Sequence, residues 1–206
     1  GSPMREVLEQ NRQQIDSSDA VERSGLKPGE YFLVSLHREE NVDHPGRLQA
    51  AVAALHALSA EYGVPVLVST HPRTRKRLES LGIADSENIR FHPPFGFHDY
   101  CKLQIDSKLV LSDSGTISEE SSLLGFPAVT LRDFIERPEA MDTGAIITAG
   151  VDAGSVQAAV QARLTAGSAA RMTPVDYEID NCAWRATAFV LSTAHSHHRR
   201  LGLHAS

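Results

Sequence analysis

Two polar clusters follow apolar runs in this chain, and their residue types suit the binding of an anion. His37-Arg38-Glu39-Glu40-Asn41 follows the run Tyr31–Leu36, and Asp113-Ser114-Gly115-Thr116 follows the run Lys108–Ser112. An imidazole, a guanidinium and the backbone N–H groups at the start of a helix can all donate hydrogen bonds to a phosphate. We therefore expect the two clusters to meet and form one phosphate-binding crevice.

The segment Ser114–Thr116 carries the clearest phosphate signal. Gly115 lets a ligand approach the backbone closely, and the N–H groups of Ser114, Gly115 and Thr116 are expected to be unpaired at the start of the following helix. Thr116 and Glu119 have the spacing of a capping box. The alternative to a phosphate-binding loop is an ordinary tight turn with a good helix cap. An Asp-Ser-Gly sequence without a longer motif favours this alternative. Neither GxGxxG nor GxxxxGK[ST] occurs, which disfavours an NAD site or a P-loop.

Three further candidates lie near the predicted crevice. The segment Arg132–Glu139 (RDFIERPE) follows a strand, and its alternative is a solvated loop in which Arg132 pairs with Asp133. His71 ends another strand, where the alternative is a structural histidine. Tyr100 lies in a predicted helix, and its spacing alone favours a place in the core.

The elements that position these residues alternate between two hydrophobic periods. The predicted strands are Tyr31–Leu36, Val64–Thr70, Ile89–Phe91, Lys108–Ser112, Pro127–Leu131 and Ala145–Ala149. The predicted helices between and after them are Pro45–Tyr62, Thr74–Leu81, Phe97–Ile105, Thr116–Leu124 and Ser155–Ala166. Nearly continuous apolar strands predict an α/β fold with a doubly wound, Rossmann-like parallel sheet. In the usual order 3-2-1-4-5-6, the first and fourth strands are neighbours, and their carboxyl ends form the ligand crevice.

The two ends of the chain have a different character. Met4–Ile15 is a charged amphipathic helix, and Ser17–Gly29 is a polar connection. Gly167–Asp180 is predicted to be a loop, and Asn181–Ser196 a last helix. The tail HSHHRRLGLH contains His195, His197 and His198, but no acidic or cysteine ligand lies nearby in sequence. We interpret it as a solvated tail and predict no metal site there.

Composition excludes several classes of protein. The net charge of −6 over 206 residues provides no global basic field for nucleic acid. Cys101 and Cys182 are too few and too far apart for a disulfide framework or a thiolate zinc site, and they suit a reducing cytoplasm. No run approaches the roughly 18 apolar residues of a membrane span.

Four separated motifs together resemble one family of enzymes. HREEN, THPRTRK, LSDSGTISEESSLLGFPAVTLRD and ERPEAMDTG occur in the order found in the C-terminal half of the non-hydrolysing UDP-N-acetylglucosamine 2-epimerases. The resemblance runs from Gly1 to about Ala166. It implies a GT-B-type fold of two Rossmann-like domains with a UDP-sugar between them. Residues 1–206 would be the C-terminal nucleotide-binding domain, with 181–206 as its closing helix and polar tail, and the N-terminal domain would be absent from this chain.

The resemblance also implies roles for single residues. His37 matches a histidine implicated in catalysis. The positions that match UDP-binding residues are Arg38, His71, Tyr100, Ser114, Gly115, Thr116, Glu120 and Arg137. Among them, the loop residues hold the diphosphate, Glu120 the ribose and Arg137 a phosphate. Thr116 departs from the glycine that many relatives carry.

The implied reaction inverts C2 of the sugar through elimination of UDP to a glycal and re-addition of UDP. The carboxylates that move the proton belong to the family's first domain, so this chain alone is expected to be an inactive part of an isomerase. No cofactor is implied. The expected partners are the UDP-sugar, the N-terminal domain and a second copy in a homodimer; neither nucleic acid nor a membrane is expected.

Three alternatives to a UDP-N-acetylglucosamine epimerase remain. FGFHDY, STHPRTRKRLE and ERPEAMDTG are similar to a subgroup that acts on UDP-2-acetamido-2,6-dideoxy sugars and forms UDP-N-acetyl-L-fucosamine. A GT-B glycosyltransferase donor domain shares the architecture and a UDP site, but the His37 motif together with ERPE argues against it. A non-catalytic UDP-binding module is the third, because half of the cleft is missing.

Overall fold

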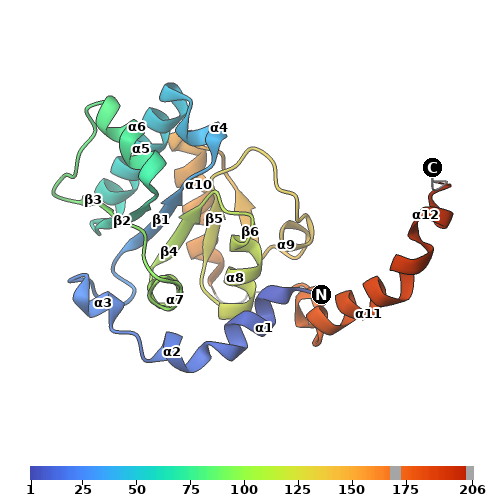
Figure 1. Cartoon of the computed structure of the whole chain (residues 1–206). Coiled ribbons are helices and arrows are strands. Elements are labelled where there is room, and N and C mark those ends of the chain that lie inside the picture. The colour runs from blue at the N-terminus through green and yellow to red at the C-terminus, as the bar shows by residue number, and fades with distance from the viewer. Residues whose placement is uncertain (168–172, 203–206) are drawn as a thin grey trace.

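The computed structural model describes residues 1–167 and 173–202, and a parallel sheet with helices on both faces forms its centre (Figure 1). The strands are β1 (Phe32–Leu36), β2 (Val66–Thr70), β3 (Ile89–His92), β4 (Leu109–Ser112), β5 (Ala128–Thr130) and β6 (Ile146–Thr148). Their order is β3-β2-β1-β4-β5-β6, and every neighbouring pair is parallel. The predicted doubly wound, Rossmann-like α/β fold is therefore confirmed.

The register of the central strands brings the two polar clusters together. Ser35 of β1 lies opposite Ser69 of β2 and Ser112 of β4. The chain after β1 and the chain after β4 therefore leave the sheet side by side at its carboxyl edge. This edge is where an open α/β sheet binds ligands.

Two apolar layers hold the helices against the sheet. The first layer joins Val34 and Leu111 of the sheet to Leu55 of α5 (Pro45–Tyr62) and Val160 of α10 (Ala153–Ala166). The second layer lies on the opposite face, where side chains at alternate strand positions meet α7 (Phe97–Ile105) and α8 (Ile117–Leu124). Strands buried on both faces explain the continuous apolar runs of the sequence.

Short helices fill the connections at the carboxyl edge. They are α4 (Glu39–Val42), α6 (Pro72–Ser80) and α9 (Glu139–Asp142). The first of these contains part of the HREEN motif, so the sequence that follows His37 turns directly into a helix.

The N-terminal segment differs from the single helix predicted over Met4–Ile15. It forms α1 (Pro3–Gln10) and α2 (Arg12–Asp16), and the polar connection that follows contains α3 (Ala20–Arg23). The break lies at Asn11, whose Nδ2 donates to the Val7 carbonyl at 2.8 Å and whose Oδ1 lies 2.7 Å from Nε2 of His98. An asparagine side chain that bonds to the backbone competes with helix continuation, which explains the break.

The C-terminal segment leaves the domain. A 3₁₀ turn, Val175–Glu178, lies in the predicted loop, while residues 168–172 of that loop and 203–206 of the predicted tail lie outside the described residues. The predicted last helix is α11 (Cys182–Thr193), followed by the turn Ala194–Ser196 and α12 (His197–Arg200). α11 buries no residue and projects from the domain (Figure 1). In the described ranges, no helix is long and apolar enough to cross a membrane.

Candidate functional site

Asp113 joins the two polar clusters at the carboxyl edge of the sheet. Its side chain has no exposed surface, and Oδ1 lies 2.9 Å from Nδ1 of His37. The carboxylate also accepts from the backbone N–H of His37 at 3.1 Å and of Arg38 at 3.0 Å. A fourth donor is Nδ2 of Asn41 at 3.2 Å. One buried carboxylate therefore fixes the whole turn that follows β1.

The contact with Asp113 determines the electrostatics of His37. The hydrogen bond raises the pKa of the His37 imidazole above its ordinary value, although partial burial opposes the shift. For Asp113, burial alone would raise the pKa of the carboxyl, but the bonds from His37, Arg38 and Asn41 outweigh burial and hold it below its ordinary value. A cationic imidazole beside the crevice can stabilise negative charge on a ligand.

Asn41 connects this turn to the next strand. Its side chain is fully buried, and Nδ2 also donates to the Leu131 carbonyl at 2.9 Å. Its Oδ1 accepts from Nη2 of Arg47 at 3.0 Å. The Asn41 side chain thus ties the turn after β1 to the chain that follows β4 and to the chain that follows β5.

The loop Ser114–Thr116 is more internally bonded than the sequence predicts. The Ser114 N–H donates to Oγ of Ser112 at 3.0 Å, and the Thr116 N–H donates to Oγ of Ser114 at 3.3 Å. The expectation of unpaired N–H groups is therefore wrong for Ser114 and Thr116, because neighbouring hydroxyls reach them. Within the described residues, the Gly115 N–H has no such acceptor.

The predicted capping box is also wrong. Thr116 occupies the N-cap position of α8 in a helical conformation, with no hydrogen bond from its side chain to the helix. Its Oγ1 lies 2.9 Å from Oγ of Ser114 instead. Glu119 turns to other partners, Ser2 and Arg137.

Two arginines converge on Gly115 from different parts of the chain. A Cβ placed on Gly115 would lie 3.6 Å from Nη1 of Arg137 and 3.6 Å from Nη2 of Arg38. Nη1 of Arg137 donates to the Gly115 carbonyl, and Nε of Arg38 donates to the Asp113 carbonyl at 3.2 Å. The absence of a side chain at Gly115 leaves space between two guanidinium groups at the start of a helix, which is a suitable place for a phosphate.

Arg132 has a structural partner other than the one predicted. It is 4% exposed and binds Glu136 with both terminal nitrogens, one contact being 2.6 Å. The hydrogen bond from Arg132 holds the pKa of Glu136 at about 2. The predicted pair with Asp133 does not form, because Asp133 lies 2.9 Å from Nη1 of Arg47. Arg132 therefore stabilises the loop, whereas Arg137 reaches Gly115.

Tyr100 lies on α7 and Glu120 on α8, two helices that cover the same face of the sheet. Nε2 of Gln104 donates to Oε2 of Glu120 at 2.6 Å. Tyr100 packs against the second apolar layer, and its hydroxyl is buried without a hydrogen-bond partner among the described residues. Burial and the charge of Glu120 raise the pKa of the Tyr100 phenol. Buried hydroxyls are normally hydrogen-bonded, so one without a partner calls for a specific explanation.

His71 lies at the carboxyl end of β2, further from the cluster. It is the N-cap of α6, and its Nδ1 accepts from the Arg73 N–H at 3.2 Å. Arg73 in turn lies 2.7 Å from Glu39 of α4. In the part of the chain that the structure describes, His71 itself shares no hydrogen bond with the residues around Asp113.

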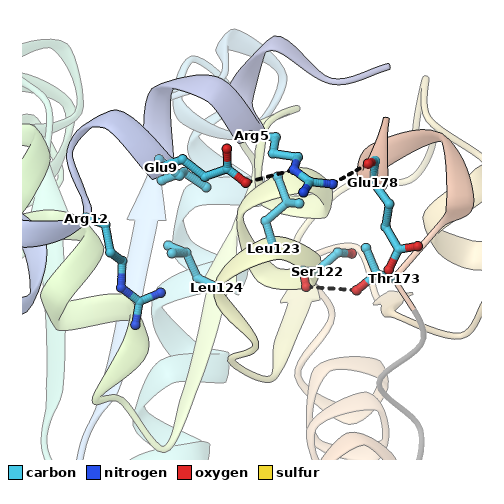
Figure 2. Close-up of a pocket in the computed structure, with 9 residues that line it drawn as sticks. Arg5, Glu9, Arg12, Ser122, Leu123, Leu124, Thr173 and Glu178 are labelled. Carbon is cyan, nitrogen blue, oxygen red and sulfur yellow. Dashed lines mark hydrogen bonds and ion pairs between the residues drawn. The ribbon is translucent and has the colours of Figure 1, made fainter. Parts of the chain in front are cut away.

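A separate pocket at the other end of α8 is a weaker candidate (Figure 2). Arg5 lies above Leu123 in this view, and Arg12 lies to the side of Leu124. Arg5 is bound by Glu9 at 2.8 Å and by the Glu178 carbonyl, as Figure 2 shows, and Arg12 lies 2.9 Å from Asp16 outside the drawn set. No sequence-predicted site residue lines this pocket.

Sequence reasoning missed three residues of the crevice as functional candidates. Asp113 and Asn41 stood inside the recognised motifs, yet only their burial reveals that they organise the loops. Glu119 was assigned to a helix cap. A buried acidic residue directly after a strand is a signal that could have identified Asp113, because such a carboxylate must find several donors.

Comparison with known proteins identifies the family of this chain. The family model described as UDP-N-acetylglucosamine 2-epimerase matches residues 1–191. The chain belongs to the UDP-N-acetylglucosamine 2-epimerase family. A UDP-N-acetylglucosamine 2-epimerase from Methanocaldococcus jannaschii is 38% identical over 125 residues, which are 59% of this chain and 34% of that protein.

Solved structures of the same epimerase family share the fold. A UDP-N-acetylglucosamine 2-epimerase from Rickettsia bellii has a TM-score of 0.83 and 38% identity, over 97% of this chain and 54% of that one. The Methanocaldococcus jannaschii enzyme in complex with UDP-GlcNAc and UDP has a TM-score of 0.77 and 30% identity. The match covers 84% of this chain and 49% of that one. The chain of 206 residues spans about half the length of these two solved relatives.

Proposed function

We propose that this chain is the UDP-binding half of a UDP-N-acetylglucosamine 2-epimerase. The observation that carries the proposal is the space at Gly115, bounded by the guanidinium groups of Arg38 and Arg137 at the start of α8. His37, whose pKa is raised by Asp113, adds an imidazole that is cationic when protonated, at the same edge of the sheet. Two guanidinium groups, this imidazole and a helix N-terminus suit the charge of a diphosphate.

The proposed reaction requires a leaving diphosphate and a moving proton. A base removes the proton at C2, the C1–O bond to UDP breaks, and a C1=C2 double bond forms. UDP then adds back to C1, and a proton enters C2 from the other face. In this proposal His37, Arg38 and Arg137 stabilise the charge that develops on the departing diphosphate.

The groups that move the proton belong, in this proposal, to an N-terminal domain outside this chain. Two carboxylates at this edge of the sheet, those of Asp113 and Glu136, are poor bases for this purpose. Asp113 is buried among four donors, and Glu136 is bound by Arg132 and has a pKa of about 2. We therefore propose that the chain binds the nucleotide and that catalysis requires the second wall of the cleft. A homodimer and a cytoplasmic location remain expectations of the same proposal.

Two aromatic side chains after β3 bear on the alternative substrate. Phe95 stacks on His92 with ring centroids 4.1 Å apart, and Phe97 is 41% exposed. An apolar surface of this kind suits a 2,6-dideoxy sugar that lacks the C6 hydroxyl. UDP-2-acetamido-2,6-dideoxy sugars, which lead to UDP-N-acetyl-L-fucosamine, are therefore the second candidate substrates. Neither the glycosyltransferase nor the non-catalytic alternative gains a specific observation.

A UDP titration of this chain tests the binding proposal. We expect the amide resonances of Gly115 and its neighbours to shift with UDP at submillimolar to millimolar concentration, because only one wall of the cleft is present. Arg12→Ala, in the pocket of Figure 2, is a matched control that removes an arginine elsewhere and should leave the titration unchanged. Undisturbed Gly115 resonances at millimolar UDP would show that the phosphate site is wrongly assigned.

A further inference from the structure

We propose that Glu119 is a positioning residue that aims Arg137 at the phosphate loop, and that the Ser2 hydroxyl holds Glu119 in place. The inference rests on the proposed UDP site, because an aimed Arg137 affects function only where a phosphate binds. It adds Glu119 to that site. Glu119 would not touch the ligand itself but would determine the conformation of Arg137, which would.

A continuous set of contacts carries the inference. Oγ of Ser2 donates to Oε1 of Glu119 at 2.6 Å, across 117 positions of the sequence. Oε2 of Glu119 lies 2.9 Å from Nη1 of Arg137. The same Nη1 donates to the Gly115 carbonyl. The Ser2 hydroxyl is thereby connected to the phosphate loop through two side chains.

Burial shows that these contacts are part of the folded core and not of a fluctuating surface. Ser2 is 1% exposed, and the Glu119 side chain is 8% exposed. Burying a carboxylate costs free energy unless donors satisfy it. Glu119 therefore needs both of its partners, Ser2 and Arg137, to stay where it is. The Arg137 side chain is 37% exposed and comes from the irregular segment before α9, so it needs an anchor to stay in one conformation.

The geometry leaves donors of Arg137 available. Within the described ranges, its contacts with Glu119 and Gly115 both use Nη1. A guanidinium carries five N–H donors, so those on Nη2 and Nε remain for a phosphate. An arginine already fixed in its binding conformation loses less entropy when the ligand arrives.

Glu119 also has an opposite effect, which makes the proposal testable. Its negative charge offsets that of Arg137 and should by itself repel a diphosphate. If Glu119 acted only through its charge, both Glu119→Ala and Glu119→Gln would bind UDP more tightly than the wild type. If it positions Arg137, Glu119→Ala binds UDP more weakly. Glu119→Gln then retains most of the affinity, because the amide oxygen still accepts from Nη1 and the amide nitrogen can donate to Ser2.

The experiment compares UDP with uridine, which lacks the diphosphate. We expect Glu119→Ala to weaken UDP binding about tenfold in calorimetry, the scale of a lost hydrogen bond to a charged group. Uridine binding, followed by NMR, should stay unchanged. Ser2→Ala should weaken UDP binding by a smaller factor. Glu61→Ala removes an exposed acidic side chain on α5 and controls for the change in net charge.

Several outcomes would overturn the proposal. They are tighter or unchanged UDP binding by Glu119→Ala, an equal loss for uridine and UDP, or an equal loss for the Gln and Ala variants. If Glu119→Ala does not fold, Ser2→Ala decides, since an unchanged UDP affinity there contradicts the connection. Failure of the UDP site itself is recognised separately, because the wild type would then bind no UDP. In that case, the heteronuclear NOE of Arg137 Nε–H tests the positioning of Arg137 alone. The NOE should fall in Ser2→Ala and Glu119→Ala, and an unchanged NOE would contradict the positioning role.

Discussion

Nδ1 of His37 lies 2.9 Å from Oδ1 of Asp113, a carboxylate that solvent does not reach. The contact places a proton on Nδ1 and leaves Nε2 as the ring atom for a ligand. When the imidazole is protonated, Nε2–H can donate to a phosphate oxygen. The pair therefore links the buried end of β4 to the chemistry of the crevice.

Replacing Asp113 with Asn should lower the pKa of His37. The carboxylate stabilises the imidazolium, and a neutral amide of the same shape cannot. In NMR titrations, the midpoint of the His37 ring resonances should therefore move to lower pH. Circular dichroism would verify that the variant is folded. An unchanged midpoint in a folded variant would mean that another group raises the His37 pKa.

UDP affinity should fall as pH rises through the pKa of His37. The raised pKa means that the imidazolium persists to a higher pH than in an isolated histidine, and only the charged form attracts the diphosphate. Calorimetry across this range should show the decrease in the wild type. The affinity of His37→Gln should not fall in this way. Because UDP itself ionises identically in both experiments, the difference between the two pH profiles reports on His37. Parallel pH profiles for the two proteins would contradict a role for the imidazolium.

Gly115→Ala should reduce UDP binding without reducing stability. The backbone of Gly115 is not in the left-handed region, and the added Cβ would make ordinary contacts at 3.6 Å with the two guanidinium groups. The methyl group would occupy the space proposed for a phosphate. Gly46→Ala on α5, where a Cβ meets nothing within 4 Å, is the matched control. Thermal unfolding measures the stability of both variants, and calorimetry measures their UDP affinity. Wild-type affinity in Gly115→Ala would place the phosphate elsewhere.

The two arginines of the loop after β5 should respond differently to truncation. Arg137→Ala should weaken UDP binding by about 1.5 kcal/mol, the lower end for a charge-assisted bond because the side chain is partly exposed. Arg132→Ala should instead lower the free energy of unfolding by about 1–3 kcal/mol, because it removes a buried side chain and the partner of Glu136. Calorimetry and chemical denaturation separate the two effects. Equal losses of UDP affinity in folded variants would mean that the arginines are wrongly assigned.

The chain alone should not exchange the C2 proton of UDP-GlcNAc with solvent. Asp113, which contacts His37, and Glu136, which contacts Arg132, are engaged by donors and cannot serve both faces of the sugar. General acid–base groups typically contribute about 10²–10⁴-fold each, so their absence should abolish measurable exchange. Mass spectrometry after incubation in D₂O measures it, with a sample without protein as the control. Deuterium at C2 above that control would reveal a proton-transferring residue in this half.

The sequence by itself determined the sheet and the place of the crevice. The apolar runs specify strands buried on both faces, a general rule gives the handedness of their crossovers, and the usual strand order for such folds proved to be the right one. His37 and Ser114 could therefore be assigned to one edge, although 77 positions separate them in the printed sequence. Strand ends were less predictable, as β2 begins at Val66 and not at Val64, because the flanking residues are also apolar.

Only the tertiary structure decided which side chains meet in that crevice. The bonds of Asp113 to the turn after β1, of Arg132 to Glu136, and of Ser2 through Glu119 to Arg137 depend on rotamers and on burial. Residue spacing specifies which face of an element a side chain occupies, but not which of several nearby partners it binds. Polar partners are chosen by the need to satisfy every buried donor and acceptor at once, and that requirement exists only when the whole fold is assembled.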